Sequence, residues 1–300
     1  MHRFLVTGAS GQLGAYLLRE LQRRGAIATA WCRTSREAPF FGYDLQPVDL
    51  ARADEVAAAF RAARPDAVIH AGAFSRIDEC YRDPTAAHRV NIGGTETLAR
   101  LCDEARCRLV YVSTDLVFDG RRGGYQEQDV PAPLSVYGTT KAAAEHSVLA
   151  IERGVVVRIS LLFGPSLSGR VGFFNAQLQS LIARTPMPLF EDEWRTPLSL
   201  STAADGLLAI AETDFRGILH LGGPERMSRW EMGVRLATAL GGDASVFRCA
   251  KQVDVFAPEP RPRDVSFDCR LFRREFPQVP WPCWEEALKI LGLHRLPTAG

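Results

Sequence analysis

The chain has 300 residues, 46% of them hydrophobic and 24% charged, which are values typical of a globular protein with a sizeable core. Its 36 basic and 35 acidic residues give a formal net charge of +1 without a basic block, so nucleic acid is not an expected partner. No apolar run reaches the about 18 residues of a membrane-spanning helix, and no signal peptide is recognisable. We therefore expect a cytoplasmic protein that does not contact a membrane. The seven cysteines are scattered without a C-x-x-C pair, which predicts neither a disulfide framework nor a metal site.

The first elements predict a dinucleotide-binding turn. A strand-like run at residues 3–6 leads into Gly8, Gly11 and Gly14, and an amphipathic helix follows from Tyr16. Glycines at this point allow a tight turn and close approach of the backbone to a pyrophosphate, and the helix N-terminus supplies N–H donors. The cofactor contacts expected here are Gly8, Ser10, Gly11, Gln12 and Leu13.

The residues that follow the second strand, 27–32, affect which dinucleotide is preferred. An acidic residue after this strand would bind a ribose 2′-hydroxyl, but the chain has Arg33, then Arg36, and no carboxylate until Glu37. Guanidinium groups favour a 2′-phosphate. The sequence predicts that NADP(H) is preferred, while NAD(H) stays possible.

The next segments extend the predicted cofactor site. Residues 46–50 resemble a third short strand, with Asp49 able to accept a hydrogen bond from an adenine amino group and Leu50 beside it. A helix at 53–63 and a buried strand at 67–70 follow, and His70 is interpreted as a core histidine. After this strand, Ala71, Gly72 and Ala73 allow the backbone to lie against a cofactor, and Ser75 is a predicted substrate contact.

The central stretch places hydroxyl, carboxyl, phenol and ammonium groups close together. A long helix at 84–106 carries Asn91, and an apolar run at 109–112 then ends in Ser113, Thr114 and Asp115. Tyr137 and Lys141 follow on a helix predicted at 137–150, four residues apart and therefore on one face. The Lys141 ammonium is expected to lower the pKa of the Tyr137 phenol, which suits proton transfer to a carbonyl or alcohol oxygen.

The alternation of strands and helices continues to residue 164 and then loosens. A core strand at 155–159 contains Arg158, a cation that must be paired or reach a ligand. Residues 202–212 and 218–221 are expected to return to the first domain. Together the elements predict an α/β fold: a Rossmann-type doubly wound parallel sheet in residues 1–164, and a smaller C-terminal α+β substrate lobe made mainly of residues 165–300. Helices are predicted in this lobe at 174–184 and 228–240.

Four motifs resemble the extended short-chain dehydrogenase/reductases, and more narrowly the dTDP-4-dehydrorhamnose reductase branch. They are TGASGQLG at 7–14, VSTDLVFDG at 112–120, YGTTKAAAE at 137–145 and RPRDVSFD at 261–268. The resemblance implies that Tyr137 is the proton donor, that Thr114 assists it, and that Lys141 binds the nicotinamide ribose. It also implies a nucleotide-linked sugar between the lobes. The remaining implied contacts are Ser113, Tyr137 and Lys141 to the cofactor, and Ser75, Thr114, Asp115, Arg195 and Arg261 to the substrate.

Some positions depart from this branch. Leu161 stands where an aromatic residue lines the substrate in the rhamnose-forming enzymes, Phe173 stands where asparagine is frequent, and Arg195 replaces a small residue. The leading hypothesis is an NADPH-dependent reductase of a carbonyl, the 4-keto group of a nucleotide-linked deoxysugar. The alternatives are a sugar-nucleotide epimerase and a non-catalytic NADP-binding regulatory subunit. Leu116 disfavours dehydratases, which commonly have glutamate there. A homodimer is possible through helices 84–106 and 137–150; the alternative is that their apolar faces pack on the sheet.

Overall fold

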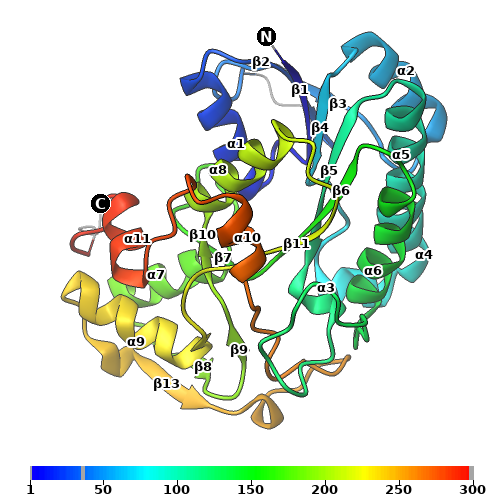
Figure 1. Cartoon of the computed structure of the whole chain (residues 1–300). Coiled ribbons are helices and arrows are strands. Elements are labelled where there is room, and N and C mark those ends of the chain that lie inside the picture. The colour runs from blue at the N-terminus through cyan, green and yellow to red at the C-terminus, as the bar shows by residue number, and fades with distance from the viewer. Residues whose placement is uncertain (1, 35–37, 297–300) are drawn as a thin grey trace.

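The computed structural model describes residues 2–34 and 38–296, and its centre is a seven-stranded sheet (Figure 1). All neighbouring strands are parallel, in the order β11-β6-β5-β4-β1-β2-β3. The strands are β1 (Arg3–Thr7), β2 (Ile27–Cys32), β3 (Leu45–Pro47), β4 (Ala67–His70), β5 (Arg108–Thr114), β6 (Gly154–Ile159) and β11 (Gly217–Leu221). The predicted doubly wound α/β fold is confirmed, and β3 is shorter than the predicted strand at 46–50 because only three residues pair with β2.

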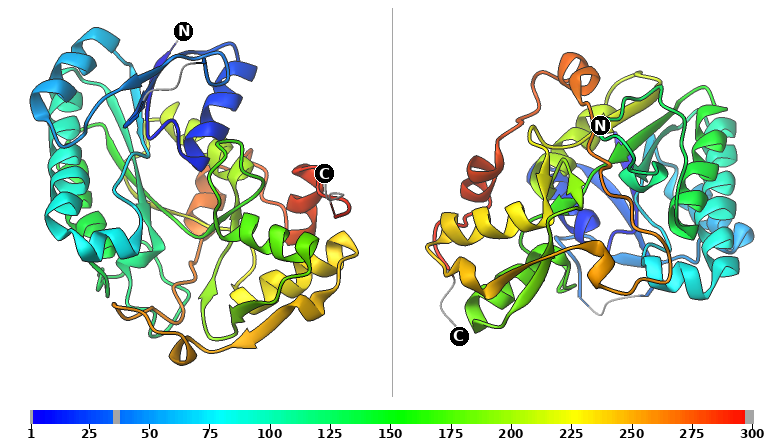
Figure 2. Two further views of the ribbon diagram at one scale, coloured as in Figure 1. Left: turned by 180° about the vertical axis from the view of Figure 1, so that it is seen from behind. Right: turned by 90° about the horizontal axis from the view of Figure 1, so that it is seen from below.

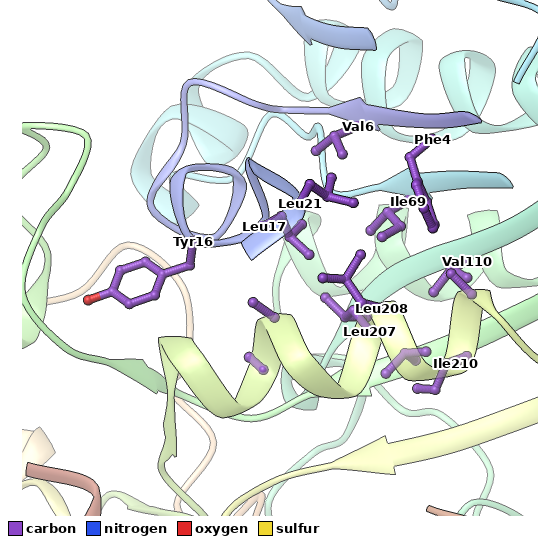
Figure 3. Close-up of a cluster of buried hydrophobic side chains, with 14 of the residues drawn as sticks. Phe4, Val6, Tyr16, Leu17, Leu21, Ile69, Val110, Leu207, Leu208 and Ile210 are labelled. Atoms are coloured by element: carbon purple, nitrogen blue, oxygen red, sulfur yellow. The ribbon is translucent and has the colours of Figure 1, made fainter. Parts of the chain in front are cut away.

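Helices cover both faces of this sheet (Figures 1 and 2). One face carries α1 (Gln12–Arg23) and α8 (Leu200–Ala211), and the other carries α2 (Ala53–Ala63), α5 (Gly94–Glu104) and α6 (Val136–Leu149). Figure 3 shows the core beneath α1 and α8, where Leu17, Leu21, Leu207, Leu208 and Ile210 pack with Phe4, Val6, Ile69 and Val110 of the sheet. Burial of each such side chain contributes about 1.5–3 kcal/mol, which holds the strand ends in a fixed relation.

The helix predicted at 84–106 has a widened turn in its middle. It begins as α4 (Pro84–Ala87), passes through the π-helical segment η1 (His88–Gly93) and continues as α5. Asn91 lies in the π segment, accepts a hydrogen bond from Phe74 N (2.8 Å), and donates to Phe74 O (3.0 Å) and to Thr140 Oγ1 (2.9 Å). Asn91 thus ties the segment after β4 to α6.

The second lobe packs around its own apolar cluster, which includes Phe163, Phe174, Leu236 and Trp284. Its main helices are α7 (Phe173–Ala183), α9 (Arg229–Leu240) and α11 (Trp284–Ile290). Its short strands pair as β10 (Leu198–Ser199) with β7 (Leu162–Phe163), β12 (Met227–Ser228) with β9 (Trp194–Arg195), and β13 (Phe247–Ala250) with β8 (Met187–Phe190). Short helices complete both lobes. In the first part of the chain they are α3 (Ile77–Arg82) and η2 (Asp115–Val117), and later in the chain they are η3 (Ala244–Val246), η4 (Gln252–Asp254) and α10 (Arg270–Glu275).

Two segments from the later part of the chain return to the first lobe, as expected from the sequence. The strand β11 pairs with β6 along its whole length, and α8 packs on α1. The segment that follows β13 runs from the second lobe toward α3 of the first lobe (Figures 1 and 2). None of the helices in residues 2–34 and 38–296 is long and apolar enough to cross a membrane.

Candidate active site

The glycine turn after β1 leaves no room for side chains. Gly8 has a φ of +67°, and a Cβ there would lie 2.8 Å from the carbonyl oxygen of Ala71 and from Gly72 N. A Cβ at Gly14 would lie 2.4 Å from the carbonyl oxygen of Gly8. The turn, which includes Ser10, Gly11 and Leu13, opens on the N-terminus of α1, whose free N–H groups favour an anion. It lies at the switch point between β1 and β4, where such sheets bind dinucleotides.

A buried hydroxyl and imidazole hold the two sides of this turn together. Gly72 N donates to Thr7 Oγ1 (2.9 Å), and Thr7 Oγ1 lies 2.7 Å from His70 Nδ1. The other ring nitrogen of His70 lies 3.0 Å from Thr95 Oγ1. Burial lowers the pKa of His70 to about 3. His70 is therefore a neutral core histidine, as predicted.

Two residues predicted from the third strand have different surroundings. A Cβ at Gly72 would lie 2.9 Å from Leu50 Cδ1, so Leu50 lies against the glycine turn. Asp49 is exposed, and its carboxylate accepts from Ala51 N (3.0 Å) in its own turn. Arg33 is exposed directly after β2, and Ala73 is partly buried after β4. Arg36 and Glu37 lie outside the described residues.

Gln12 was predicted to contact the cofactor, and its side-chain amide binds the second lobe. Gln12 Nε2 donates to the carbonyl oxygen of Arg170 (2.9 Å) and to Asn175 Oδ1 (3.5 Å), both in the second lobe. A Cβ at Gly172 would lie 2.6 Å from Gln12 Nε2. The side chain of Gln12 thus joins the glycine turn to the second lobe, and only its backbone is left to contact a dinucleotide.

The end of β5 separates the two neighbouring hydroxyls. Successive side chains of a strand point to opposite faces. Ser113 Oγ donates to Glu145 Oε1 on α6 (2.5 Å), so its hydroxyl is turned toward α6, and contact of Ser113 with the cofactor stays a prediction. Thr114 lines the cavity between the lobes and donates to Asp115 Oδ1 (3.2 Å). Thr114 is therefore the hydroxyl available for chemistry.

The predicted tyrosine and lysine lie beside Thr114. Ser135 caps α6 by accepting from Gly138 N (3.1 Å), which fixes the first turn that carries Tyr137. The Thr114 hydroxyl lies close enough to the Tyr137 phenol to lower the pKa of that phenol. Lys141 is 2% exposed, and its Nζ lies 4.0 Å from the centre of the Tyr111 ring. The structure thus places Tyr137 beside Thr114, and Lys141 one helical turn further along α6 against Tyr111.

The pKa of Tyr137 in the protein alone differs from the expectation. Burial raises it well above the ordinary value, the nearby Asp115 carboxyl and Cys80 thiol raise it further, and the Thr114 hydroxyl opposes them. Burial also lowers the pKa of Lys141 to about 7, while the Glu145 carboxylate acts in the opposite direction. Tyr137 is consequently a neutral phenol, which is the form that can give a proton.

A cavity of about 580 Å³ lies between the lobes, within the size range of ligand sites. The first lobe contributes Thr114, Asp115 and Ser135, and the second contributes Arg195, Arg229 and Arg261. Phe173 and Leu161 also line it. Phe173, on α7, packs against the guanidinium of Arg229 (4.2 Å) and so gives the cavity wall an aromatic ring.

Acidic and basic side chains alternate along one wall of the cavity. Asp115 Oδ2 lies 3.4 Å from Arg195 Nε, Arg195 Nη2 lies 3.2 Å from Glu193 Oε1, and Glu193 Oε1 lies 2.8 Å from Arg229 Nη2. Burial by itself would raise the pKa of Glu193, but the guanidiniums of Arg229 and Arg195 hold it at about 2. Burial raises the pKa of Asp115 against the effect of the same two arginines. Two of the three cavity arginines thus already have carboxylate partners.

The other predicted substrate contacts have different outcomes. Arg261 lines the cavity, packs over the Phe190 ring (5.2 Å), and forms no ion pair within 4 Å with any described carboxylate. Ser75 is exposed and does not line the cavity, so its contact with the substrate stays a prediction. The short helix α3 starts two residues later and turns Ile77 and Asp78 toward the cavity instead.

A group of possible metal ligands lies in the second lobe, away from this cavity. Glu225, Cys283 and Glu285 offer ligand atoms within 4.8 Å of one another. Both carboxylates already bind Arg235, at 2.8 Å from Glu225 and 2.5 Å from Glu285. The guanidinium supplies the positive charge that a metal ion would bring.

Sequence reasoning did not find Glu193 and Arg229, although both lie in the cavity wall. Glu193 directly precedes β9 and Arg229 begins α9, and no local spacing links either residue to Thr114. The four-residue spacing that relates Tyr137 to Lys141 also relates Lys141 to Glu145, so helical periodicity could have identified Glu145. Arg158 was expected to need a partner, and this partner is Glu145 (2.7 Å).

A family model described as RmlD substrate binding domain matches residues 1–293. The chain belongs to this RmlD family. The match spans both lobes, the glycine turn and the cavity between them. The extended short-chain dehydrogenase/reductase resemblance seen in the four motifs is therefore confirmed for the fold and for the family.

Three curated relatives of this RmlD family member have different names. The probable low-salt glycan biosynthesis reductase Agl14 of Haloferax volcanii is 30% identical, with 88% of each chain covered. Methionine adenosyltransferase 2 subunit beta of Pongo abelii is 31% identical, covering 89% of this chain and 80% of that one. The dTDP-4-dehydrorhamnose reductase of Streptomyces griseus is 31% identical, covering 89% and 85%.

A solved structure supports the fold. The hypothetical dTDP-4-dehydrorhamnose reductase from Sulfolobus tokodaii superposes with a TM-score of 0.82 at 26% identity, covering 95% of this chain and 98% of that chain. The likeness extends over the sheet and the second lobe together. The arrangement of the two lobes is thus shared with that protein.

Proposed function

We propose that this RmlD family member is an NADPH-dependent reductase of a carbonyl, the 4-keto group of a nucleotide-linked deoxysugar. The proximity of the neutral Tyr137 phenol to Thr114, which lines the cavity, carries the proposal, because it puts a proton donor beside the space where a carbonyl oxygen can be bound. The names of the Haloferax and Streptomyces relatives, both reductases, support the same reaction class.

The cofactor is a nicotinamide dinucleotide bound along the ends of β1, β2 and β4. The glycine turn fits its pyrophosphate, since a Cβ at Gly8, Gly14 or Gly72 would collide with backbone or with Leu50. Arg33 lies where the adenosine ribose is expected, and it favours a 2′-phosphate. A bound NADPH supplies the hydride that reduces the carbonyl carbon.

The protein residues supply the proton. Tyr137 donates its phenolic proton to the carbonyl oxygen as negative charge develops there, and Thr114 orients the phenol. Lys141, with a pKa of about 7, is partly cationic at neutral pH and stabilises the phenolate that Tyr137 becomes. Since hydroxyl, phenol and ammonium groups act in sequence, each removal is expected to lower turnover by about 10²–10⁴-fold.

The second lobe is suited to the phosphate groups of a nucleotide. Arg195 and Arg229 are held by Glu193, whereas Arg261 at the cavity has no carboxylate within 4 Å in the described chain. A guanidinium that packs over an aromatic ring and lacks a carboxylate is well suited to bind a diphosphate. The sugar then lies toward Thr114 and the nucleotide toward Arg261.

The test is NADPH oxidation with a panel of nucleotide-linked 4-keto sugars and simple ketones. Tyr137→Phe should lose turnover and keep NADPH binding, while Tyr81→Phe, which alters a 48% exposed phenol on α3, serves as the control and should keep both. Retained turnover in Tyr137→Phe would refute the assignment.

A second candidate function is a regulatory subunit that binds NADP without turnover. The 31% identity to methionine adenosyltransferase 2 subunit beta favours it. The presence of Thr114, Tyr137 and Lys141 in one site favours the reductase. Tight NADP binding together with inactivity toward every ketone of the panel would select the regulatory function.

A further inference from the structure

The side of α6 behind the proposed active site contains a buried pair of charges that the proton-transfer reaction does not itself use. Glu145 is 3% exposed and Arg158, on β6, is 1% exposed. Arg158 Nη2 lies 2.7 Å from Glu145 Oε2, and Arg158 Nε lies 3.0 Å from Glu145 Oε1. Such two-pronged pairing fixes the orientation of both groups.

The carboxylate of this pair is connected directly to the proposed site. Glu145 lies four residues after Lys141, on the same face of α6. Its Oε1 accepts the hydroxyl of Ser113, the residue before Thr114, at 2.5 Å. Glu145 therefore contacts the strand that carries the hydroxyl and acts electrostatically on the proposed lysine.

The arginine is held from its other side, so it cannot swing away from Glu145. Arg158 Nη1 donates to the carbonyl oxygen of Glu127 (3.3 Å) and lies 3.5 Å from His220 Nε2. The other nitrogen of His220 lies 3.0 Å from the carbonyl oxygen of Tyr125, and burial lowers the pKa of His220 to about 3. The Glu127 carboxylate accepts from His220 N (3.1 Å).

We propose that Glu145 and Arg158 are positioning residues: the Glu145 carboxylate, one turn from Lys141 on α6, keeps Lys141 cationic, and Arg158 fixes that carboxylate. This proposal rests on the proposed function, because the proposed reduction is what gives Lys141 its role. The other titratable groups around Lys141 are Tyr137 on α6, Tyr111 on β5 and His70 on β4, and none of these three is a carboxylate. Glu145 is therefore the anion available to offset the burial of the ammonium.

The charges predict opposite effects for the two single variants. Glu145→Gln removes the anion and leaves the Arg158 cation, so Lys141 should lose its proton at lower pH. Arg158→Gln leaves the carboxylate without its partner, so Lys141 should keep its proton to higher pH. The double variant has no charge at either position, so the pKa of Lys141 in it should be close to that in the original protein.

The titration can be observed directly, because the chain has three lysines, at positions 141, 251 and 289. Protein labelled with ¹³C-lysine gives few side-chain signals, which are assigned with Lys251→Arg and Lys289→Arg variants and followed by NMR from pH 5 to 10. Neighbouring charges shift a pKa by about 1–3 units, so Glu145→Gln should lower the Lys141 midpoint by about one unit or more. Glu285→Gln, which breaks the distant pair with Arg235, is the matched control and should leave the midpoint unchanged.

An unchanged Lys141 midpoint in Glu145→Gln would overturn the proposal, as would a double variant that titrates like Glu145→Gln. If Glu145→Gln does not fold, Arg158→Gln tests the same charge effect with the opposite sign, and an unchanged or lowered midpoint there would contradict it. Because NMR reads the protonation of Lys141 without a substrate, these results are separate from the proposed reductase activity. In an active preparation, the fall in kcat with rising pH should move with the same midpoint.

Discussion

Arg195 Nε lies 3.4 Å from Asp115 Oδ2, and this contact joins the second lobe to the end of the strand that carries Thr114. Both side chains are buried, and Asp115 also accepts from Ser160 Oγ (3.2 Å) and from Thr114 Oγ1 (3.2 Å). The position of the lobe and the orientation of the proposed hydroxyl are therefore set by the same carboxylate.

Replacement of Arg195 should destabilise the protein strongly. Arg195→Met leaves the carboxylates of Asp115 and Glu193 with less positive charge around them, and loss of one partner of a buried pair costs about 3–5 kcal/mol. Urea unfolding measures this loss. Arg226→Met is the control, since Arg226 is 47% exposed in its pair with Asp264 and such pairs contribute about 0–1 kcal/mol.

The double variant Arg195→Met/Asp115→Asn separates charge from packing. It removes the unpaired Asp115 charge, so part of the stability lost in Arg195→Met should return. A double variant that is less stable than the sum of the single changes would show that the contact acts through packing and not through charge.

Arg33 should determine the preference between the two dinucleotides. Arg33→Ala removes the exposed guanidinium after β2, and we expect the KM for NADPH to rise about tenfold, the equivalent of 1.4 kcal/mol, with the KM for NADH nearly unchanged. Arg100→Ala on α5 is the control, because Arg100 is exposed and pairs only with Glu104. A tenfold preference for NADH in the original protein would contradict the prediction.

The core of the proposed site could be predicted from the sequence because it is local. Thr114 is the last residue of β5, and Tyr137 lies in the first turn of α6, the next long helix in the chain. Strand alternation predicts the face on which Thr114 lies, and helical spacing predicts the face on which Tyr137 and Lys141 lie. The same alternation turns the Ser113 hydroxyl toward α6, away from Thr114. Ser75 lies before α3, which begins at Ile77, and does not line the cavity.

The cavity wall in the second lobe could not be predicted. Glu193 and Arg229 meet because β9 pairs with β12, directly before α9, and this two-residue pairing has no pattern in the sequence. The π-helical turn at 88–93 was also missed, since its sequence continues an ordinary helical pattern. These features depend on tertiary packing, which overrides local propensity.

Arg261 should contribute to substrate binding and not to chemistry. Arg261→Ala removes a cavity guanidinium that has no ion pair in the described chain, so the KM of a diphosphate-linked sugar should rise about 10–100-fold with kcat little changed, equivalent to about 1.4–2.8 kcal/mol. Arg263→Ala is the matched control, because this exposed neighbour does not line the cavity. Equal effects of the two replacements, or a loss confined to kcat, would contradict this role.

Two buried histidines should make the protein sensitive to mild acid. Burial lowers the pKa of His70 and of His220 from 6.5 to about 3, so below pH 6.5 the unfolded chain binds protons that the folded chain does not. Stability is then present above pH 6.5 and is lost as pH falls, by about 1.4 kcal/mol per pH unit for each histidine. Urea unfolding between pH 7 and 5 measures this slope. His70→Gln should reduce it by half, whereas His146→Gln, which alters an exposed histidine on α6, should leave it unchanged. An equal slope in His70→Gln and the original protein would show that His70 is not the group responsible.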